Sequence, residues 1–338
     1  MEERANNLTS SPMKVSIILP IYNVGQYIET CLKSILEQIG SFSMELILVD
    51  DCGNDDSIKR SLSILNDSCC SYQLWKHDKN RGISAARNTA LLKALGDYVL
   101  FVDSDDILAS NCLKELCEAA EMIPDADVIV GQFDEFMEES KYYPSGWKQK
   151  NGVYSNNVIE EYLKGNIPAT AWNKLIKRSF LLDHKLFFEE GLIHEDALWS
   201  FQVACMSFKI VVTDSVTYHY RQRSGSLDKQ NNQELHLYNY SRVNYLQLKY
   251  VFEHSLEKEN CIYHFLEKNR FQLLIDAYRC NRHLSKEIYK LFKKSSYWNL
   301  WQRTTMAQTT MKIWLRNLHW SLPAKLGYHM LMVVYRNR

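Results

Sequence analysis

Three carboxylates follow an apolar segment near the end of the first hundred residues. Tyr98–Val102 is apolar, and Asp103, Asp105 and Asp106 come directly after it. The segment predicts a buried strand whose carboxyl end carries concentrated negative charge. A divalent cation is the usual compensation, since carboxylate oxygens bind it and it can in turn hold a diphosphate. Alone the pattern is weak, because Asp-rich turns are common as solvated loops.

Polar residues follow other predicted strands in the same way. Val15–Leu19 precedes Pro20–Asn23, and Glu45–Val49 precedes the pair Asp50-Asp51. Further strands are expected at 72–75, 128–133, 209–213 and 217–221, and helices at 28–36, 84–95, 158–163 and 195–207. This alternation predicts an α/β fold with an open, mostly parallel sheet and flanking helices. Ligands of such sheets bind beyond the carboxyl ends of the strands, where these polar residues lie.

The residues at this edge suit a nucleoside diphosphate. Tyr22 can stack on a base, and Asp51 can accept a hydrogen bond from a base imide or a ribose hydroxyl. Asn80–Gly82 leads into a helix whose N-terminus favours anions, and Arg87 adds a fixed positive charge there. Taken alone, Arg87 and the turn fit an ordinary surface ion pair and an ordinary loop better than a binding site.

Four ordered segments carry a family resemblance. They are VSIILPIYNVGQYIETCLKSIL, ELILVDDCGNDDS, NRGISAARNTAL and GDYVLFVDSDD. Together they resemble the family 2 glycosyltransferases, which are inverting enzymes with the GT-A nucleotide-sugar fold. The resemblance covers residues 13–225. One departure is Cys52-Gly53, where the family more often has Gly-Ser, but this turn variation leaves both preceding aspartates in place.

The resemblance implies a metal-assisted donor site. Its residues would be Pro20, Tyr22, Asp51, Asp103, Ser104 and Asp105. Asp105, aided by Asp103, would hold Mg²⁺ or Mn²⁺, and Arg87 would lie near the diphosphate.

A second acidic pair resembles the catalytic part of the family. In His194-Glu195-Asp196, the resemblance makes Asp196 the general base and gives Glu195 an orienting or acceptor-side role. A sugar hydroxyl must lose a proton as it attacks the anomeric carbon, so the chemistry requires such a base. The alternative is that both carboxylates only cap a helix and compensate its dipole.

The segment 217–226 resembles the mobile flap that closes over the donor in relatives. Arg221 and Arg223 are two residues apart on a predicted strand, so they share one face and can both reach phosphate oxygens. His219 lies on that face and is a possible metal ligand, although a lone strand histidine is more often structural. Trp172 resembles an acceptor-lining residue of the family, with core packing as the alternative.

The charge of the chain is distributed unevenly. Residues 281–338 carry eleven Lys/Arg and one acid, Glu287, which gives +10, so the rest of this neutral chain carries −10. An acidic body argues against nucleic acid as a partner, whereas a basic tail fits an anionic membrane surface. Trp298, Trp301, Trp314, Trp320 and the segment 326–335 add the aromatic and aliphatic side chains of interfacial helices. The alternative is a helical subdomain that packs these tryptophans.

The remaining composition favours a cytoplasmic protein. Nine cysteines without a CxxC pair indicate reduced thiols, and the N-terminus shows no secretory signal. The sequence contains no run of 18 or more apolar residues, so no membrane-spanning helix is expected. We expect a disordered N-terminus over 1–12, a GT-A catalytic domain over 13–227, and a helical, basic C-terminal region over 228–338.

The expected activity is metal-dependent, inverting transfer of one sugar from a nucleoside diphosphate sugar. The donor is expected to be a UDP-sugar and the acceptor a hydroxyl of a glycan or a lipid-linked saccharide, at the inner face of the cell membrane. One alternative is a non-catalytic nucleotide-sugar or glycan-binding module of the same fold. Another is a sugar nucleotidyltransferase, although no Gly-rich basic loop follows the first strand. The absence of GxGxxG there disfavours a dinucleotide oxidoreductase.

Overall fold

A computed structural model of the chain describes residues 12–138, 141–144, 150–222, 232–294 and 318–336. The chain divides into two compact units. Unit 1 comprises residues 1–155, 171–187 and 208–223, and unit 2 comprises residues 156–170, 188–207 and 224–338. The predicted disordered N-terminus falls, apart from Pro12, outside the described residues.

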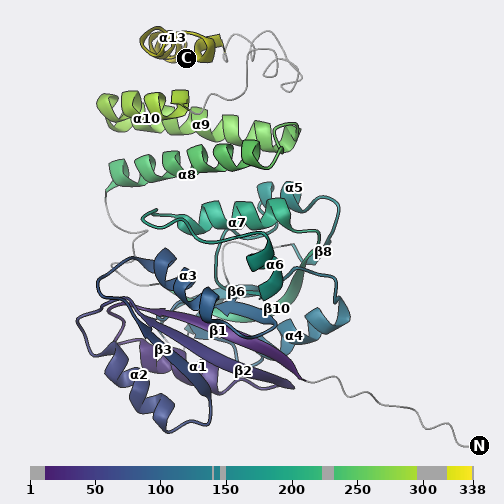
Figure 1. The fold of residues 1–338 in the computed structure, drawn as a ribbon. Coiled ribbons are helices and arrows are strands. Elements are labelled where there is room, and N and C mark those ends of the chain that lie inside the picture. Colours follow the sequence, from purple (N-terminus) through teal and green to yellow (C-terminus); the bar gives the residue numbers. More distant parts are fainter. Residues whose placement is uncertain (1–11, 139–140, 145–149, 223–231, 295–317, 337–338) are drawn as a thin grey trace, which may run out of the picture. The chain divides into compact units, whose positions relative to one another are not determined.

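Unit 1 is built on a mixed sheet (Figure 1). Its strands are β1 (Met13–Ile21), β2 (Phe42–Asp50), β3 (Ser71–Lys76), β4 (Tyr98–Phe101), β5 (Ile107–Leu108), β6 (Val128–Glu138), β7 (Lys141–Pro144), β8 (Gly152–Tyr154), β9 (Lys174–Lys177) and β10 (Ile210–Arg221). The order is β3-β2-β1-β4-β9-β6-β10-β5, with β7 on β6 and β8 on β10. The first four of these strands are parallel, as are β6 and β10, whereas β9 runs antiparallel to β4 and β6.

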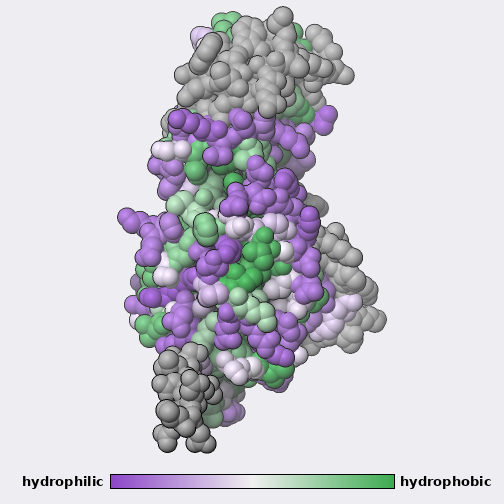
Figure 2. Space-filling view, turned by 90° about the vertical axis from the view of Figure 1, so that its right-hand side faces the viewer, coloured by the Kyte–Doolittle hydropathy of each residue, from purple (hydrophilic) through white to green (hydrophobic). Residues whose placement is uncertain are grey.

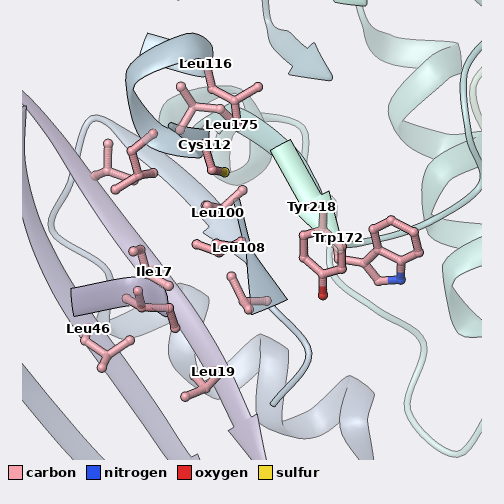
Figure 3. Packing of buried hydrophobic residues seen from close by; sticks show 14 of the residues in the cluster. Ile17, Leu19, Leu46, Leu100, Leu108, Cys112, Leu116, Trp172, Leu175 and Tyr218 are labelled. Atoms are coloured by element: carbon pink, nitrogen blue, oxygen red, sulfur yellow. The ribbon is translucent and has the colours of Figure 1, made fainter. Parts of the chain in front are cut away.

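Helices cover the two faces of this sheet. They are α1 (Ile28–Leu36), α2 (Ser57–Asn66), α3 (Ile83–Lys93), α4 (Cys112–Met122) and the short α6 (Arg178–Asp183). Alternate strand residues such as Ile17, Leu19 and Leu100 form one core with α1 and α4 (Figure 3). The helix α3 packs on β1 and β2 outside that core, so it covers the opposite face. This layering matches the predicted α/β fold class.

The strand β9 was not expected from the sequence. The residue before it, Asn173, has a left-handed backbone with φ of 60° and is buried. Its amide donates to the carbonyl oxygens of Gly131 and Gln132, and its Oδ1 accepts from the Thr217 hydroxyl at 2.6 Å. One side chain thus joins β6, β9 and β10, and the antiparallel β9 makes the sheet mixed rather than mostly parallel.

Unit 2 is helical. It contains α5 (Val158–Leu163), α7 (Glu195–Met206), α8 (Gln233–Glu253), α9 (Asn260–Cys280), α10 (Arg282–Lys294), the 3₁₀ turn η2 (Leu318–Ser321) and α13 (Ala324–Arg336). Leu198 of α7 packs with Val243 of α8, and the Ala197 carbonyl accepts from Tyr162 and from Gln247. Because α5 and α7 join the C-terminal helices in this way, the division differs from the single boundary expected near residue 227.

The C-terminal helices pack around an aromatic centre. Trp320 is buried, stacks on Tyr289 at 5.1 Å between ring centroids, and lies under the Arg270 guanidinium at 4.3 Å. Arg270 is itself buried and paired with Glu267 at 2.9 Å. The expectation that Trp320 is an interfacial side chain is therefore wrong, because its ring is enclosed by its own subdomain. The other three tryptophans of this region lie outside the described residues.

The described surface is largely polar on the face shown in Figure 2, where hydrophobic residues gather in a limited patch among hydrophilic ones. Among the described residues, no helix is long and apolar enough to cross a bilayer.

Candidate active site

The carboxyl ends of three parallel strands form one edge of unit 1. β1 ends at Ile21, β2 at Asp50 and β4 at Phe101, and they are neighbours in the sheet. The loops after β1 and β2 are tied together, since Asn23 accepts from the Asn54 N–H and Asp55 from the Gly25 N–H, both at 2.8 Å. The edge is therefore braced by hydrogen bonds.

Asp51 is a buried anchor of this edge. Its Oδ1 accepts the Arg81 N–H at 2.9 Å, and its Oδ2 accepts the Gly82 N–H at 2.8 Å. Oδ1 also lies 2.6 Å from Nδ1 of His77, whose Nε2 is 3.0 Å from the Thr89 hydroxyl. Asp51 thus holds the turn that begins α3, a positioning role in addition to the base or ribose contact expected for it.

The loop after β4, residues 103–106, places its carboxylates in different environments. Asp103 pairs through Oδ1 with the buried guanidinium of Arg87 at 2.7 Å, while its side chain stays 21% exposed. Asp105 is also partly exposed. Asp106 is buried and accepts from the Tyr218 hydroxyl at 2.7 Å and from the Arg221 N–H at 2.8 Å. Burial, followed by the neighbouring Asp105 and Asp103 carboxylates, raises the pKa of Asp106 well above its ordinary value.

Arg221 is held inside unit 1. Its Nε donates to the Asp105 carbonyl at 2.7 Å, and its guanidinium lies 4.9 Å and 4.5 Å from the ring centroids of Tyr27 and Phe136. The residue is only 7% exposed, so it supports the acidic loop rather than standing open on a flap. Arg223, its expected partner at the phosphate, lies outside the described residues.

His219 is engaged by a neighbouring strand. Its Nδ1 lies 2.5 Å from Oδ1 of Asp134 on β6, and its ring lies against Tyr142 with centroids 4.2 Å apart. The suggested metal ligand thus has a carboxylate partner at Nδ1, an arrangement shared by structural and metal-ligating histidines, so its role stays a prediction.

The residues expected to face the sugar or base differ in exposure. Tyr22 is 47% exposed, which leaves its ring open to stack on a base, whereas Pro20 and Ser104 are buried. Trp172 is 8% exposed and stacks between Tyr218 and Tyr220, with ring centroids 4.5 Å and 5.5 Å away. Figure 3 shows Trp172 beside Tyr218 at the edge of the core. Core packing, which was the alternative to acceptor binding, therefore accounts for the position of Trp172.

The acidic loop offers some, but not all, of the ligands that a hard divalent cation needs. Asp103 and Asp105 offer carboxylate oxygens, the ligands that Mg²⁺ and Mn²⁺ prefer. Within the described ranges, no group of three or more His, Cys, Asp or Glu side chains is arranged to hold a metal ion. Mg²⁺ typically binds through one or two carboxylates together with substrate phosphates, so a bound diphosphate would have to complete the ligand set.

Glu195 and Asp196 lie in unit 2, in the first turn of α7. The helix follows His194, which has a left-handed backbone with φ of 65°, and the Ala197 N–H donates to Oδ1 of Asp196 at 2.9 Å. His194 contacts α8 through its Nε2, which lies 3.0 Å from Nδ1 of His236. Both capping and catalysis use an acid at this position, so the catalytic role of Asp196 stays a prediction.

Sequence reasoning missed three residues that hold the site together. They are His77, Asp106 as a buried anchor, and Tyr218. His77 follows β3 directly, so the rule that functional residues follow strands could have found it. Asp106 gave that signal as an acid after a strand, but its pairing with Tyr218 gave none, because it spans 112 residues of sequence.

Comparison with known proteins agrees with this geometry. Residues 16–182 match the model of glycosyl transferase family 2. Over these residues the chain is similar to this family. Glycosyltransferase GlyA of Streptococcus pneumoniae is 34% identical to the chain over 227 residues, which are 64% of the chain and 32% of GlyA. Glycosyltransferase GlyG of the same species is 29% identical over 234 residues, 63% of the chain and 72% of GlyG. The chain thus spans about a third of GlyA and most of GlyG.

Solved structures show the same fold. A crystal structure of residues 1–349 of S. aureus TarS in complex with UDP-GlcNAc matches with a TM-score of 0.73 and 20% identity. The match covers 96% of this chain and 93% of that one. The family 2 resemblance and the GT-A fold expected from the sequence are therefore confirmed.

Proposed function

We propose that this family 2 enzyme is a metal-dependent, inverting glycosyltransferase that uses a UDP-sugar. The observation that carries the proposal is the acidic loop at the carboxyl edge of the parallel strands, where Asp103 and Asp105 are partly exposed and the exposed Tyr22 follows the neighbouring strand β1. UDP is the nucleotide of choice because the TarS structure that shares this fold was crystallised with UDP-GlcNAc.

The residues of unit 1 would bind the donor. Tyr22 would stack on the uracil ring, while Asp51 holds the turn 80–82 that faces the nucleotide side of the edge. Asp105, aided by Asp103, would hold Mg²⁺ or Mn²⁺, which when bound supplies positive charge to the diphosphate. Arg87 orients Asp103 for this role through its 2.7 Å contact.

Asp196 of unit 2 would act as the general base. Its carboxylate would take the proton of the acceptor hydroxyl while the hydroxyl oxygen bonds to the anomeric carbon. The bond from that carbon to the diphosphate oxygen breaks on the opposite face, and UDP leaves with the electron pair. One displacement inverts the anomeric centre. Glu195, its neighbour in the first turn, would orient the acceptor.

The acceptor would be a hydroxyl of a glycan or of a lipid-linked saccharide, reached from the cytoplasmic side of the membrane. A basic stripe on α10 supports membrane docking. Arg282, Lys286, Lys290 and Lys294 are exposed at intervals of four residues. Ser285, Ile288, Tyr289 and Phe292 form the buried side of the same helix. A stripe with this spacing lies on one helix face, where it can meet an anionic lipid surface.

A donor screen tests the class and the donor together. Purified protein with Mn²⁺ is offered UDP-, GDP- and dTDP-sugars, and release of the nucleoside diphosphate is followed with and without EDTA. We expect UDP to be released faster from one UDP-sugar than from the other donors, and EDTA to abolish this release. The anomeric configuration of the product, measured by NMR, tests inversion. If the protein binds a donor but transfers its sugar to none of the acceptors offered, a non-catalytic module is favoured. If it releases pyrophosphate from UTP and a sugar phosphate, a nucleotidyltransferase is favoured.

A further inference from the structure

We infer that the Tyr218–Asp106 pair positions the acidic loop for the cation and diphosphate of the donor. The inference rests on the proposed function, and it assigns a role to two side chains that are neither metal ligands nor donor contacts.

Tyr218 lies between two parts of the acidic loop. Its hydroxyl donates to Oδ2 of Asp106 at 2.7 Å and accepts the backbone N–H of Asp103 at 3.2 Å. The same oxygen therefore fixes the first residue of the loop and the last one. Since Tyr218 is fully buried and its ring stacks on Trp172, the hydroxyl has little freedom to move.

The end of β10 holds the loop at further points. Oδ1 of Asp106 accepts the Arg221 N–H at 2.8 Å, and the Asp105 carbonyl accepts from Nε of Arg221 at 2.7 Å. Downstream, Tyr218 pairs with Leu108 in the antiparallel β5–β10 ladder. The main chain on both sides of the Asp105 side chain is thus attached to one strand.

This attachment leaves the exposed carboxylates to bind ligands. Both carboxylate oxygens of Asp106 accept hydrogen bonds from β10. The partly exposed carboxylates of the loop are therefore those of Asp103 and Asp105. The carboxylates of Asp103 and Asp105 repel each other, and without a rigid frame these side chains would separate. Holding them in one arrangement lowers the ordering cost of binding a cation and a diphosphate.

The test compares two tyrosine variants of the full chain. Tyr218→Phe keeps the ring that stacks on Trp172 and removes only the bridging hydroxyl. Tyr154→Phe is the matched control. Tyr154 is also buried in unit 1, its hydroxyl donates to the Lys150 carbonyl at 2.6 Å, and it pairs with Ile210, eight residues before Tyr218 on the same strand.

The readout is binding of UDP with and without Mn²⁺, measured by titration calorimetry, with circular dichroism to confirm folding. Tyr218→Phe is expected to weaken Mn²⁺-dependent UDP binding about tenfold, because it removes the hydroxyl that bonds both Asp106 and the Asp103 N–H. Metal-free UDP binding should change less than about twofold, and Tyr154→Phe should leave both values near wild type. If Tyr218→Phe does not fold, Asp106→Asn replaces it and is expected to show the same selective loss.

Two outcomes overturn the inference and are distinguishable. Equal losses in both tyrosine variants, or an unchanged Mn²⁺ dependence in Tyr218→Phe, would overturn the positioning role while the donor site stands. No Mn²⁺-dependent UDP binding by the wild-type chain would overturn the proposed donor site itself, and the positioning role with it.

Discussion

Oδ2 of Asp51 accepts the backbone N–H of Gly82 at 2.8 Å, and this bond joins the residue after β2 to the N-cap residue of α3. Gly82 has φ of 85°, a left-handed value that suits glycine, so the turn has a shape that few other residues adopt. The acid that follows β2 therefore shapes the edge of the sheet as well as contributing to its charge.

Replacing Asp51 by asparagine should disturb this turn. An amide presents one oxygen and one NH₂ group, so one of the N–H donors at residues 81 and 82 loses its acceptor. We expect the free energy of unfolding to fall by about 1–3 kcal/mol and the affinity for UDP to fall with it. Urea denaturation and calorimetry measure the two effects. Asp97→Asn, at an exposed aspartate that accepts from the Lys14 N–H, is the control and should change neither.

The Arg87–Asp103 pair gives a second prediction. Arg87→Met keeps most of the side-chain volume but leaves the Asp103 carboxylate without its cation. Because Asp103 is partly exposed, we expect the free energy of unfolding to fall by about 2–3 kcal/mol, less than when a fully buried pair is broken. Mn²⁺ should raise the melting temperature of the variant more than that of the wild type, since it restores positive charge at Asp103. Equal shifts in the two proteins would contradict a metal site at this carboxylate.

Substitutions of Asp196 and of Glu195 are predicted to have different effects on the rate of sugar transfer. Asp196→Asn should lower the rate of sugar transfer by a factor of about 10²–10⁴ while UDP-sugar binding is unchanged, because only proton removal is lost. Glu195→Gln, in the same helical turn, is the matched control and should cost far less. Steady-state transfer rates and donor titrations measure both. If the two variants lose the same small amount, the acidic pair caps α7 and the base lies elsewhere.

Glu45 should make the stability of unit 1 depend on pH. Burial alone would raise the pKa of Glu45, but hydrogen bonds from the Ser16 hydroxyl and the Leu95 N–H outweigh it and lower the pKa. Its contribution is therefore fully present above the unfolded value of about 4.3 and is lost as pH falls through the lower folded value. The stability gap between wild type and Glu45→Gln should be constant near neutral pH and shrink below about pH 4. A gap that is unchanged in acid would refute this.

The α10 stripe predicts electrostatic membrane binding. Lys286→Glu with Lys294→Glu should weaken co-sedimentation with phosphatidylglycerol vesicles at least about thirtyfold, since each cation near an anionic leaflet contributes about 1 kcal/mol. Lys59→Glu with Lys114→Glu, at exposed sites on α2 and α4, makes the same charge change and should bind like wild type. Truncation is a poorer test, because Ile288 and Phe292 of α10 share a core with Leu274 and Ala277 of α9. Equal losses in the two pairs would point to net charge alone.

The sequence was informative where local pattern decides structure. Strands β1, β2 and β4 are largely apolar and are followed by polar residues, which after β2 and β4 are acids, so both the strands and the edge that carries Asp51 and Asp103 could be predicted. The helix over Glu195–Met206 was predicted for the same reason. These features depend on residues that are close together in the chain.

What could not be predicted depends on distant pairing. The short β9 owes its place to Asn173, whose amide reaches Gly131, about forty residues away. The burial of Arg221 follows from its contacts with Tyr27, Phe136 and the Asp105 carbonyl. No spacing rule reveals such contacts, since each requires the sheet order to be known first.

The docking of α7 on α8 has a consequence during synthesis. Ribosomes deliver the chain from its N-terminus, so the acidic loop and α7 emerge well before α8, which begins at Gln233. Until then Leu198 has no Val243 to cover it, and the Ala197 carbonyl lacks its Gln247 donor. A nascent or prematurely terminated polypeptide would carry an almost finished acidic edge while α7 still lacks its contacts with α8. The helix that carries the proposed base, Asp196, would then be completed only after α8 has been made.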